Sequence, residues 1–91
     1  PPYRLAWIYL NTGDYDDALN MANAALGKVY GPRKARVHKL IADIHKSRGD
    51  KESELEARKQ VVAVYEALPE GHASPTALTR AKKALAAITG G

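Results

Sequence analysis

The chain has 91 residues, a formal net charge of +4 at pH 7 and no cysteine. This length permits one small domain or part of a repeat array, and it excludes an enzyme with separate cofactor and substrate domains. Without cysteine there is no disulfide or thiolate–metal site, and no apolar stretch is long enough to span a bilayer. We expect a soluble protein with no membrane partner, and the cytoplasm is only slightly favoured as its compartment.

Helical patterns separated by Gly, Asp and Pro run through the whole sequence. They predict five helices, over about residues 2–12, 15–28, 33–48, 51–68 and 75–88. Gly13 and Gly49 can end one helix in the left-handed conformation, and the aspartate after each can cap the next helix. The last helix follows a Pro- and Gly-rich stretch and begins at Ser74–Pro75, a favourable helix start.

One segment of the chain repeats. The turn at 11–14 recurs 36 residues later at 47–50, and the same offset relates five pairs of flanking residues: Leu5 with Ile41, Ala6 with Ala42, Leu19 with Leu55, Ala25 with Val61 and Leu26 with Val62. Such repetition is typical of stacked helical hairpins. We therefore expect two hairpins within residues 1–68, at about 2–30 and 33–68, and a linker at 69–74. The segment 75–91 would be a capping helix or the start of a third repeat.

The first hairpin resembles the tetratricopeptide repeat (TPR) family at Leu5-Ala6, Tyr9, Gly13-Asp14-Tyr15, Ala18, Ala25 and Leu26. The second hairpin keeps fewer of the family's residues: Ile41, Ala42, Gly49-Asp50 and Val61. It departs from the small or aromatic residues of the family at Glu54, Arg58, His38 and His45. The resemblance covers about residues 3–68 and implies an all-α fold of antiparallel helix hairpins stacked as a right-handed solenoid. The first helix of the first repeat lacks its opening residues, so we expect the chain to be part of a longer array.

The resemblance also implies a concave groove, lined by the first helix of each hairpin, that binds an extended peptide or a partner helix. In the helix predicted over 33–48, four charged residues share the side opposite the apolar arc: Arg36, Lys39, Asp43 and Lys46. These four match the groove-facing positions of the family, and in the first helix the matching positions hold Tyr3, Trp7, Leu10 and Asn11. Cationic side chains can hold the carboxylates of a partner, and aromatic side chains supply contact area. We therefore expect a non-enzymatic protein–protein interaction scaffold, with these eight as partner-binding residues and a protein or peptide with acidic groups as the partner.

Two other functions fit parts of the sequence. The first helix is apolar nearly all round, so the chain could be a structural segment that packs on neighbouring repeats or self-associates through its end helices. Nucleic-acid binding is less favoured. Residues 28–51 hold eight Lys and Arg against two Asp, but the helix after Gly49 opens with acidic residues that would repel phosphates. A further basic cluster, Arg80, Lys82 and Lys83, is interpreted as a solvated face.

Catalytic and metal chemistry is not expected. His38 and His45 share a helix face but are seven residues apart, roughly 10.5 Å along the axis, which is too far for both to bind one metal ion at about 2.1 Å. We interpret them as core or near-core histidines. His72 has no second ligand near it in the sequence, and no phosphate-binding glycine loop or catalytic motif occurs. We therefore predict no enzyme activity, no catalytic or metal-binding residues, no cofactor and no small-molecule substrate.

Overall fold

The computed structural model describes residues 1–90, and these residues form five helices and no strand. The helices are α1 (Pro2–Thr12), α2 (Tyr15–Leu26), α3 (Pro32–Ser47), α4 (Lys51–Ala67) and α5 (Pro75–Thr89). The predicted all-α class is confirmed, and every helix end lies within two residues of its predicted position. Gly91, the last residue of the predicted C-terminal segment 75–91, lies outside the described residues.

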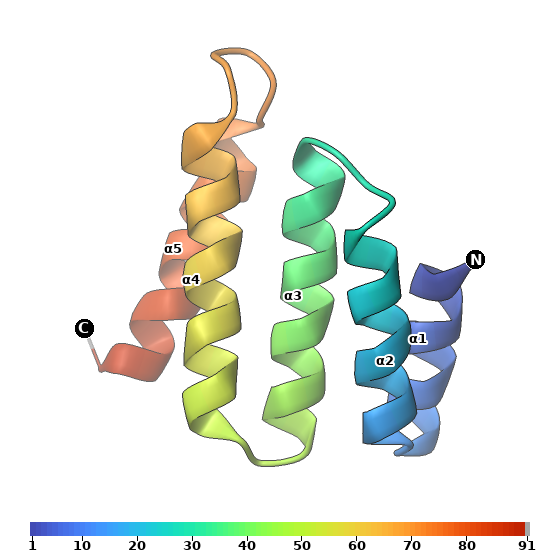
Figure 1. The fold of residues 1–91 in the computed structure, drawn as a ribbon. Coiled ribbons are helices and arrows are strands. Elements are labelled where there is room, and N and C mark those ends of the chain that lie inside the picture. Colours follow the sequence, from blue (N-terminus) through green and yellow to red (C-terminus); the bar gives the residue numbers. More distant parts are fainter. Residues whose placement is uncertain (91) are drawn as a thin grey trace.

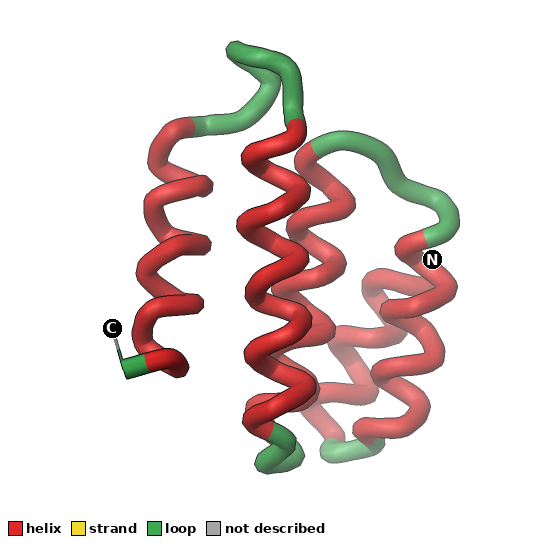
Figure 2. The backbone as a smooth tube through the Cα atoms, turned by 60° about the vertical axis from the view of Figure 1, so that its left-hand side comes forward, coloured by secondary structure: helices red, strands yellow, loops and turns green. Residues whose placement is uncertain are grey.

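Successive helices run in opposite directions and lie side by side (Figure 1). Each helix contacts its neighbour in sequence, and α1 also contacts α3. In contrast, the backbone of α5 closely approaches only that of α4 among the helices. Figures 1 and 2 together place α1 and α5 on the same side of the row formed by α2, α3 and α4. The two helices on either side of α4, α3 and α5, therefore flank it, and their backbones do not approach each other closely.

The core consists of two clusters of buried side chains. The larger cluster joins α1, α2 and α3, and its most deeply buried large side chains are Val37, Leu40 and Ile44 of α3. Small residues such as Ala18 and Ala22, both 0% exposed, allow α2 to approach its neighbours closely. The smaller cluster joins α3, α4 and α5 through Ala35, Val61 and Ala81. Consequently α3 and α4 are held by extensive packing, whereas α5 depends on a small apolar contact.

The two Gly-Asp turns share a backbone conformation but differ in their side-chain contacts. Gly13 and Gly49 have φ values of 79° and 80°, the left-handed conformation that glycine adopts without a steric penalty. Asp50 caps α4, because its Oδ1 accepts a hydrogen bond from the backbone N–H of Ser53 at 3.1 Å. This bond and the Ser53 hydroxyl lower the pKa of Asp50. Asp14 makes no such bond to α2; its Oδ2 accepts from the Thr12 hydroxyl at 2.6 Å. The predicted aspartate cap is therefore confirmed in the second turn and wrong in the first.

His38 and His45 are half-buried on α3, as expected for near-core positions. Burial lowers the pKa of both side chains below 6.5, and the nearby Lys34 lowers the pKa of His38 further. For His45, Arg48 lowers the pKa and Asp50 raises it by a smaller amount. The Nδ1 atom of His45 is buried without a hydrogen-bond partner among the described residues, so a proton there would have no acceptor.

These histidines predict a pH-dependent stability. The unfolded chain takes up protons near pH 6.5, whereas the folded chain does so only at lower pH, because its histidine pKa values are lowered. The free energy of unfolding should therefore be highest above pH 6.5 and should fall as the pH drops below it. Urea titrations from pH 7.5 to pH 5.5 would measure this slope. The change in the free energy of unfolding with pH should be smaller in the double variant His38→Gln/His45→Gln. It should persist in the control His72→Gln, which changes an exposed loop residue.

Candidate binding site

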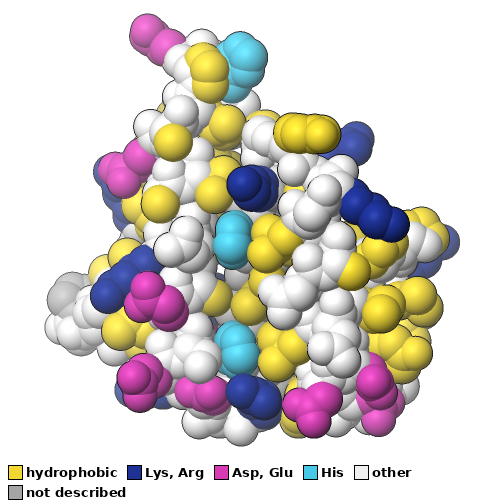
Figure 3. Space-filling view, in the orientation of Figure 1, with side chains coloured by type: hydrophobic (Ala, Val, Ile, Leu, Met, Phe, Trp, Pro, Cys, Tyr) yellow, Lys and Arg dark blue, Asp and Glu magenta, His cyan; other side chains and the backbone are white. Residues whose placement is uncertain are grey.

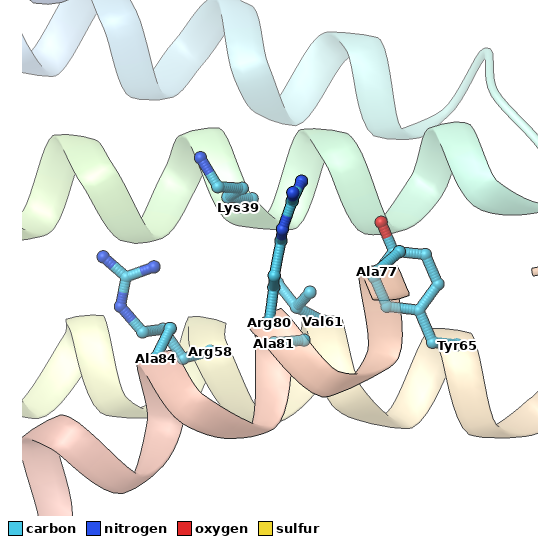
Figure 4. Close-up of a pocket in the computed structure, with 8 residues that line it drawn as sticks. All are labelled: Lys39, Arg58, Val61, Tyr65, Ala77, Arg80, Ala81 and Ala84. Atoms are coloured by element: carbon cyan, nitrogen blue, oxygen red, sulfur yellow. The ribbon is translucent and has the colours of Figure 1, made fainter. Parts of the chain in front are cut away.

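A pocket of about 190 Å³ opens between α3 and α5, over α4 (Figure 4). Its lining consists of Lys39 from α3, Arg58, Val61 and Tyr65 from α4, and Ala77, Arg80, Ala81 and Ala84 from α5. Pockets for cofactors and drug-sized ligands measure on the order of 300–1,000 Å³. The size of this pocket therefore suits one or two side chains of a partner or a comparably small group.

The pocket exists because α5 presents alanine to its neighbours. Ala77, Ala81 and Ala84 are spaced at one-turn intervals and so lie on one face of the helix. Ala81 is 8% exposed and packs in the cluster with Val61, but its side chain is too short to fill the space toward α3. The pocket consequently has an apolar wall on α5 and an apolar floor on α4.

A buried charge network forms the polar side of the pocket. Arg58 of α4 is 8% exposed, and its Nε donates a hydrogen bond to Glu54 Oε2 at 2.8 Å. Its Nη2 donates to Asp43 Oδ1 of α3 at 3.1 Å, and the other Asp43 oxygen lies 3.6 Å from Lys39 Nζ. A guanidinium that has lost most of its hydration requires such partners, because an unpaired buried charge is strongly unfavourable. The network therefore links α3 to α4 beside the pocket.

The structure places the four predicted residues of α3 on its less buried side. Arg36, Lys39 and Lys46 are exposed, and Asp43 is half-buried. Lys39 lines the pocket, and Asp43 contacts Arg58, which also lines it. Arg36 and Lys46 are on the same helix face but outside the lining. The structure thus brings two of the four predicted residues, Lys39 and Asp43, together at the pocket. Asp43 neutralises Arg58 of this protein and is not free to bind a partner.

The predicted residues of α1 lie elsewhere. Tyr3 and Leu10 are half-buried and pack against the larger core cluster, whereas Trp7 is 39% exposed and Asn11 is exposed. None of these four residues lines the pocket. The aromatic residues of α1 and the charged residues of α3 are therefore not combined in this pocket.

Among the lining residues only Lys39 is a predicted binding residue, and the others include three polar side chains, Arg58, Tyr65 and Arg80. The i, i+4 spacing of Glu54 and Arg58 is typical of an ion pair, whereas the family pattern marks both residues only as departures. Arg80 was grouped with Lys82 and Lys83 as a solvated face. Lys82 is indeed exposed and lies 3.6 Å from Glu66, but Arg80 lines the pocket.

Acidic side chains gather at the end of the molecule where the α1–α2 and α3–α4 turns lie (Figure 3). Arg48 connects the two turns, because it lies 3.7 Å from Asp16 and 3.3 Å from Asp50. Within residues 1–90, no group of three or more His, Asp or Glu side chains is arranged to hold a metal ion. None of the described helices is both long and apolar enough to cross a membrane.

No family model, no curated protein and no solved structure matches this chain. The TPR resemblance therefore rests on the sequence positions given above and stays a prediction.

The buried network predicts a large effect of removing Arg58. Arg58→Ala should lower the free energy of unfolding by about 3 kcal/mol, because it leaves the buried Glu54 carboxylate without its partner. The double variant Glu54→Leu/Arg58→Met should regain most of this loss, since it removes both charges and keeps the volume. Lys59→Ala is the control on the same helix, with an expected loss below about 0.5 kcal/mol, because Lys59 is exposed. Equal urea midpoints for Arg58→Ala and Lys59→Ala would contradict the importance of the network.

Proposed function

We propose that this protein is a non-enzymatic scaffold that binds a peptide or partner helix carrying acidic groups. The observation that carries the proposal is the pocket between α3 and α5, which combines apolar walls with three cationic side chains, Lys39, Arg58 and Arg80. Such a combination suits a protein segment with apolar and acidic side chains, because the cations form charge-assisted hydrogen bonds and the apolar walls exclude water.

In this proposal the helix hairpins stack in the TPR manner as a right-handed solenoid. The first helices of successive hairpins, α1, α3 and α5, would line the binding face. Two observations support this arrangement: α1 and α5 lie on the same side of the helix row, and the pocket opens between α3 and α5. The exposed Arg36 and Lys46 would extend the positive surface along α3 beyond the pocket.

Charge reversal on α3 tests the proposal. Arg36→Glu/Lys39→Glu should weaken binding of acidic, apolar-containing peptides by about tenfold or more at low salt, because two attractive charges become repulsive. Lys28→Glu/Lys51→Glu is the control with the same change in net charge, at positions outside the pocket and outside the α3 stripe. Calorimetric titration with a peptide panel, together with thermal melts that verify folding, would measure the effect.

Two results would contradict the proposal. One is that none of the acidic peptides binds to the wild-type protein. The other is that both double variants lose affinity equally, which would show a dependence on net charge alone.

A second candidate function is favoured by the outer face of α1. Leu5, Trp7 and Ile8 are 41%, 39% and 50% exposed, an unusual density of apolar side chains in contact with solvent. In this alternative the chain is a structural segment that packs on neighbouring repeats or self-associates through this helix.

Sedimentation velocity over a range of protein concentrations would measure self-association. If the alternative holds, the wild type should form dimers or larger species as the concentration rises, and Leu5→Gln/Ile8→Gln should stay monomeric, because the exposed apolar area is reduced. A wild type that is monomeric at every concentration would rule out self-association through α1.

A further inference from the structure

The charges around the α3–α5 pocket do not balance. Three cations line it, Lys39, Arg58 and Arg80, and two carboxylates, Asp43 and Glu54, pair with the first two of these cations. Both carboxylates are bonded to Arg58, and Asp43 is shared with Lys39. Arg80 forms no ion pair with the described residues. One positive charge at the pocket is therefore uncompensated.

Arg58 also retains an unused donor group. Its Nε and Nη2 are hydrogen-bonded, and its Nη1 has no partner among the described residues. This atom is not among the polar side-chain atoms that are buried without a partner, so it keeps some contact with solvent on a side chain that lines the pocket. Because Glu54 and Asp43 fix the guanidinium, Nη1 is a positioned donor on a side chain that is nine-tenths buried.

Arg80 approaches the same space from the other wall. Figure 4 shows its side chain reaching from α5 toward α3, where Lys39 is located. An anion between the two helices could thus accept hydrogen bonds from α5 and from α3 or α4 at once. A single carboxylate would neutralise the uncompensated charge, whereas a doubly charged phosphate would exceed it.

The rest of the pocket is apolar. Val61 is 5% and Ala81 8% exposed, and Ala77 and Ala84 continue this surface along α5. The Tyr65 ring lies at one side of the pocket, with its hydroxyl directed toward α3 (Figure 4). A branched aliphatic or aromatic side chain would replace water against these groups with favourable contacts.

From this charge imbalance and this lining, we propose that the pocket receives one apolar side chain of the bound peptide together with one neighbouring side-chain carboxylate, and that Arg80 selects for that carboxylate. The inference rests on the peptide-binding function proposed above and specifies which feature of the peptide the pocket recognises. Arg58 and Lys39 supply further hydrogen-bond donors, and the alanines of α5 provide the space for the apolar group.

Four capped dipeptides test this inference by nuclear magnetic resonance titration of the isotope-labelled full chain. They are acetyl-Leu-Glu-amide, acetyl-Leu-Gln-amide, acetyl-Ser-Glu-amide and acetyl-Leu-phosphoserine-amide. The Leu-Glu probe should shift the resonances of Val61, Tyr65 and Ala81, and it should bind about tenfold more tightly than the Leu-Gln probe, which lacks the charge. It should also bind more tightly than the Ser-Glu and phosphoserine probes.

Variants of α5 assign the selectivity to Arg80. In Arg80→Gln the Leu-Glu and Leu-Gln probes should bind equally, and Arg80→Lys should keep the preference for Leu-Glu. Lys83→Gln removes the same charge from an exposed position of the same helix that does not line the pocket, so it should also keep the preference. Arg80 is itself exposed, and these substitutions should leave the fold intact.

Several outcomes would overturn the inference. Equal affinity of Leu-Glu and Leu-Gln for the wild type would show that the pocket does not recognise a carboxylate. Tighter binding of the phosphoserine probe would contradict the preference for a single negative charge. Equal affinity of Ser-Glu and Leu-Glu would show that the apolar side chain is not recognised. Equal loss of selectivity in Arg80→Gln and Lys83→Gln would contradict the assignment of the selectivity to Arg80. Absence of shifts at the pocket with all dipeptides, while longer acidic peptides still bind, overturns the pocket assignment alone. Failure of the longer peptides overturns the proposed function as well.

Discussion

The buried guanidinium of Arg58 determines how α3 and α4 meet. A cation with 8% exposure is tolerated only where carboxylates replace the lost water, and Glu54 and Asp43 do so from two different helices. The bond from Arg58 to Asp43 therefore holds α3 against α4 at the edge of their apolar contact, next to the pocket. It also makes the exposed side of α3 more basic than its composition suggests, since the carboxylate of Asp43 is paired with Arg58.

The pocket is a consequence of small side chains next to this network. Alanines on α5 allow that helix to approach Val61 of α4, but they do not fill the space toward α3, whose backbone lies farther away. Larger apolar residues at these positions would fill the space and enlarge the second core cluster. The chain therefore combines a well-packed core at α1, α2 and α3 with a loosely filled C-terminal junction, where charged and apolar groups remain accessible together.

Most of the fold could be predicted from the sequence, because the helix signals are local. Gly-Asp turns, Ser74–Pro75 and the apolar spacing gave the helix ends within two residues. The site was predicted only in part. Lys39 was predicted from its position on α3. Whether Arg58 and Arg80 line a pocket depends on how α5 packs on α4, and the periodicity within one helix does not reveal this packing. Likewise, Asp43 lies on the same face of α3 as its basic neighbours, and only the position of α4 shows that it pairs with Arg58. The arrangement of the hairpins as a solenoid stays a prediction.

The limited packing of α5 has a consequence for the dynamics of the chain. Because this helix closely approaches only α4, the free energy needed to detach it should be smaller than the free energy of unfolding the whole domain, and its amide protons should exchange with solvent earlier than those of α3. The pocket wall would detach with it, so the pocket is complete only while α5 is docked. A molecule bound between α3 and α5 would join two helices whose backbones do not approach each other closely, and it would couple the C-terminal helix to the cooperative unit formed by the rest of the chain.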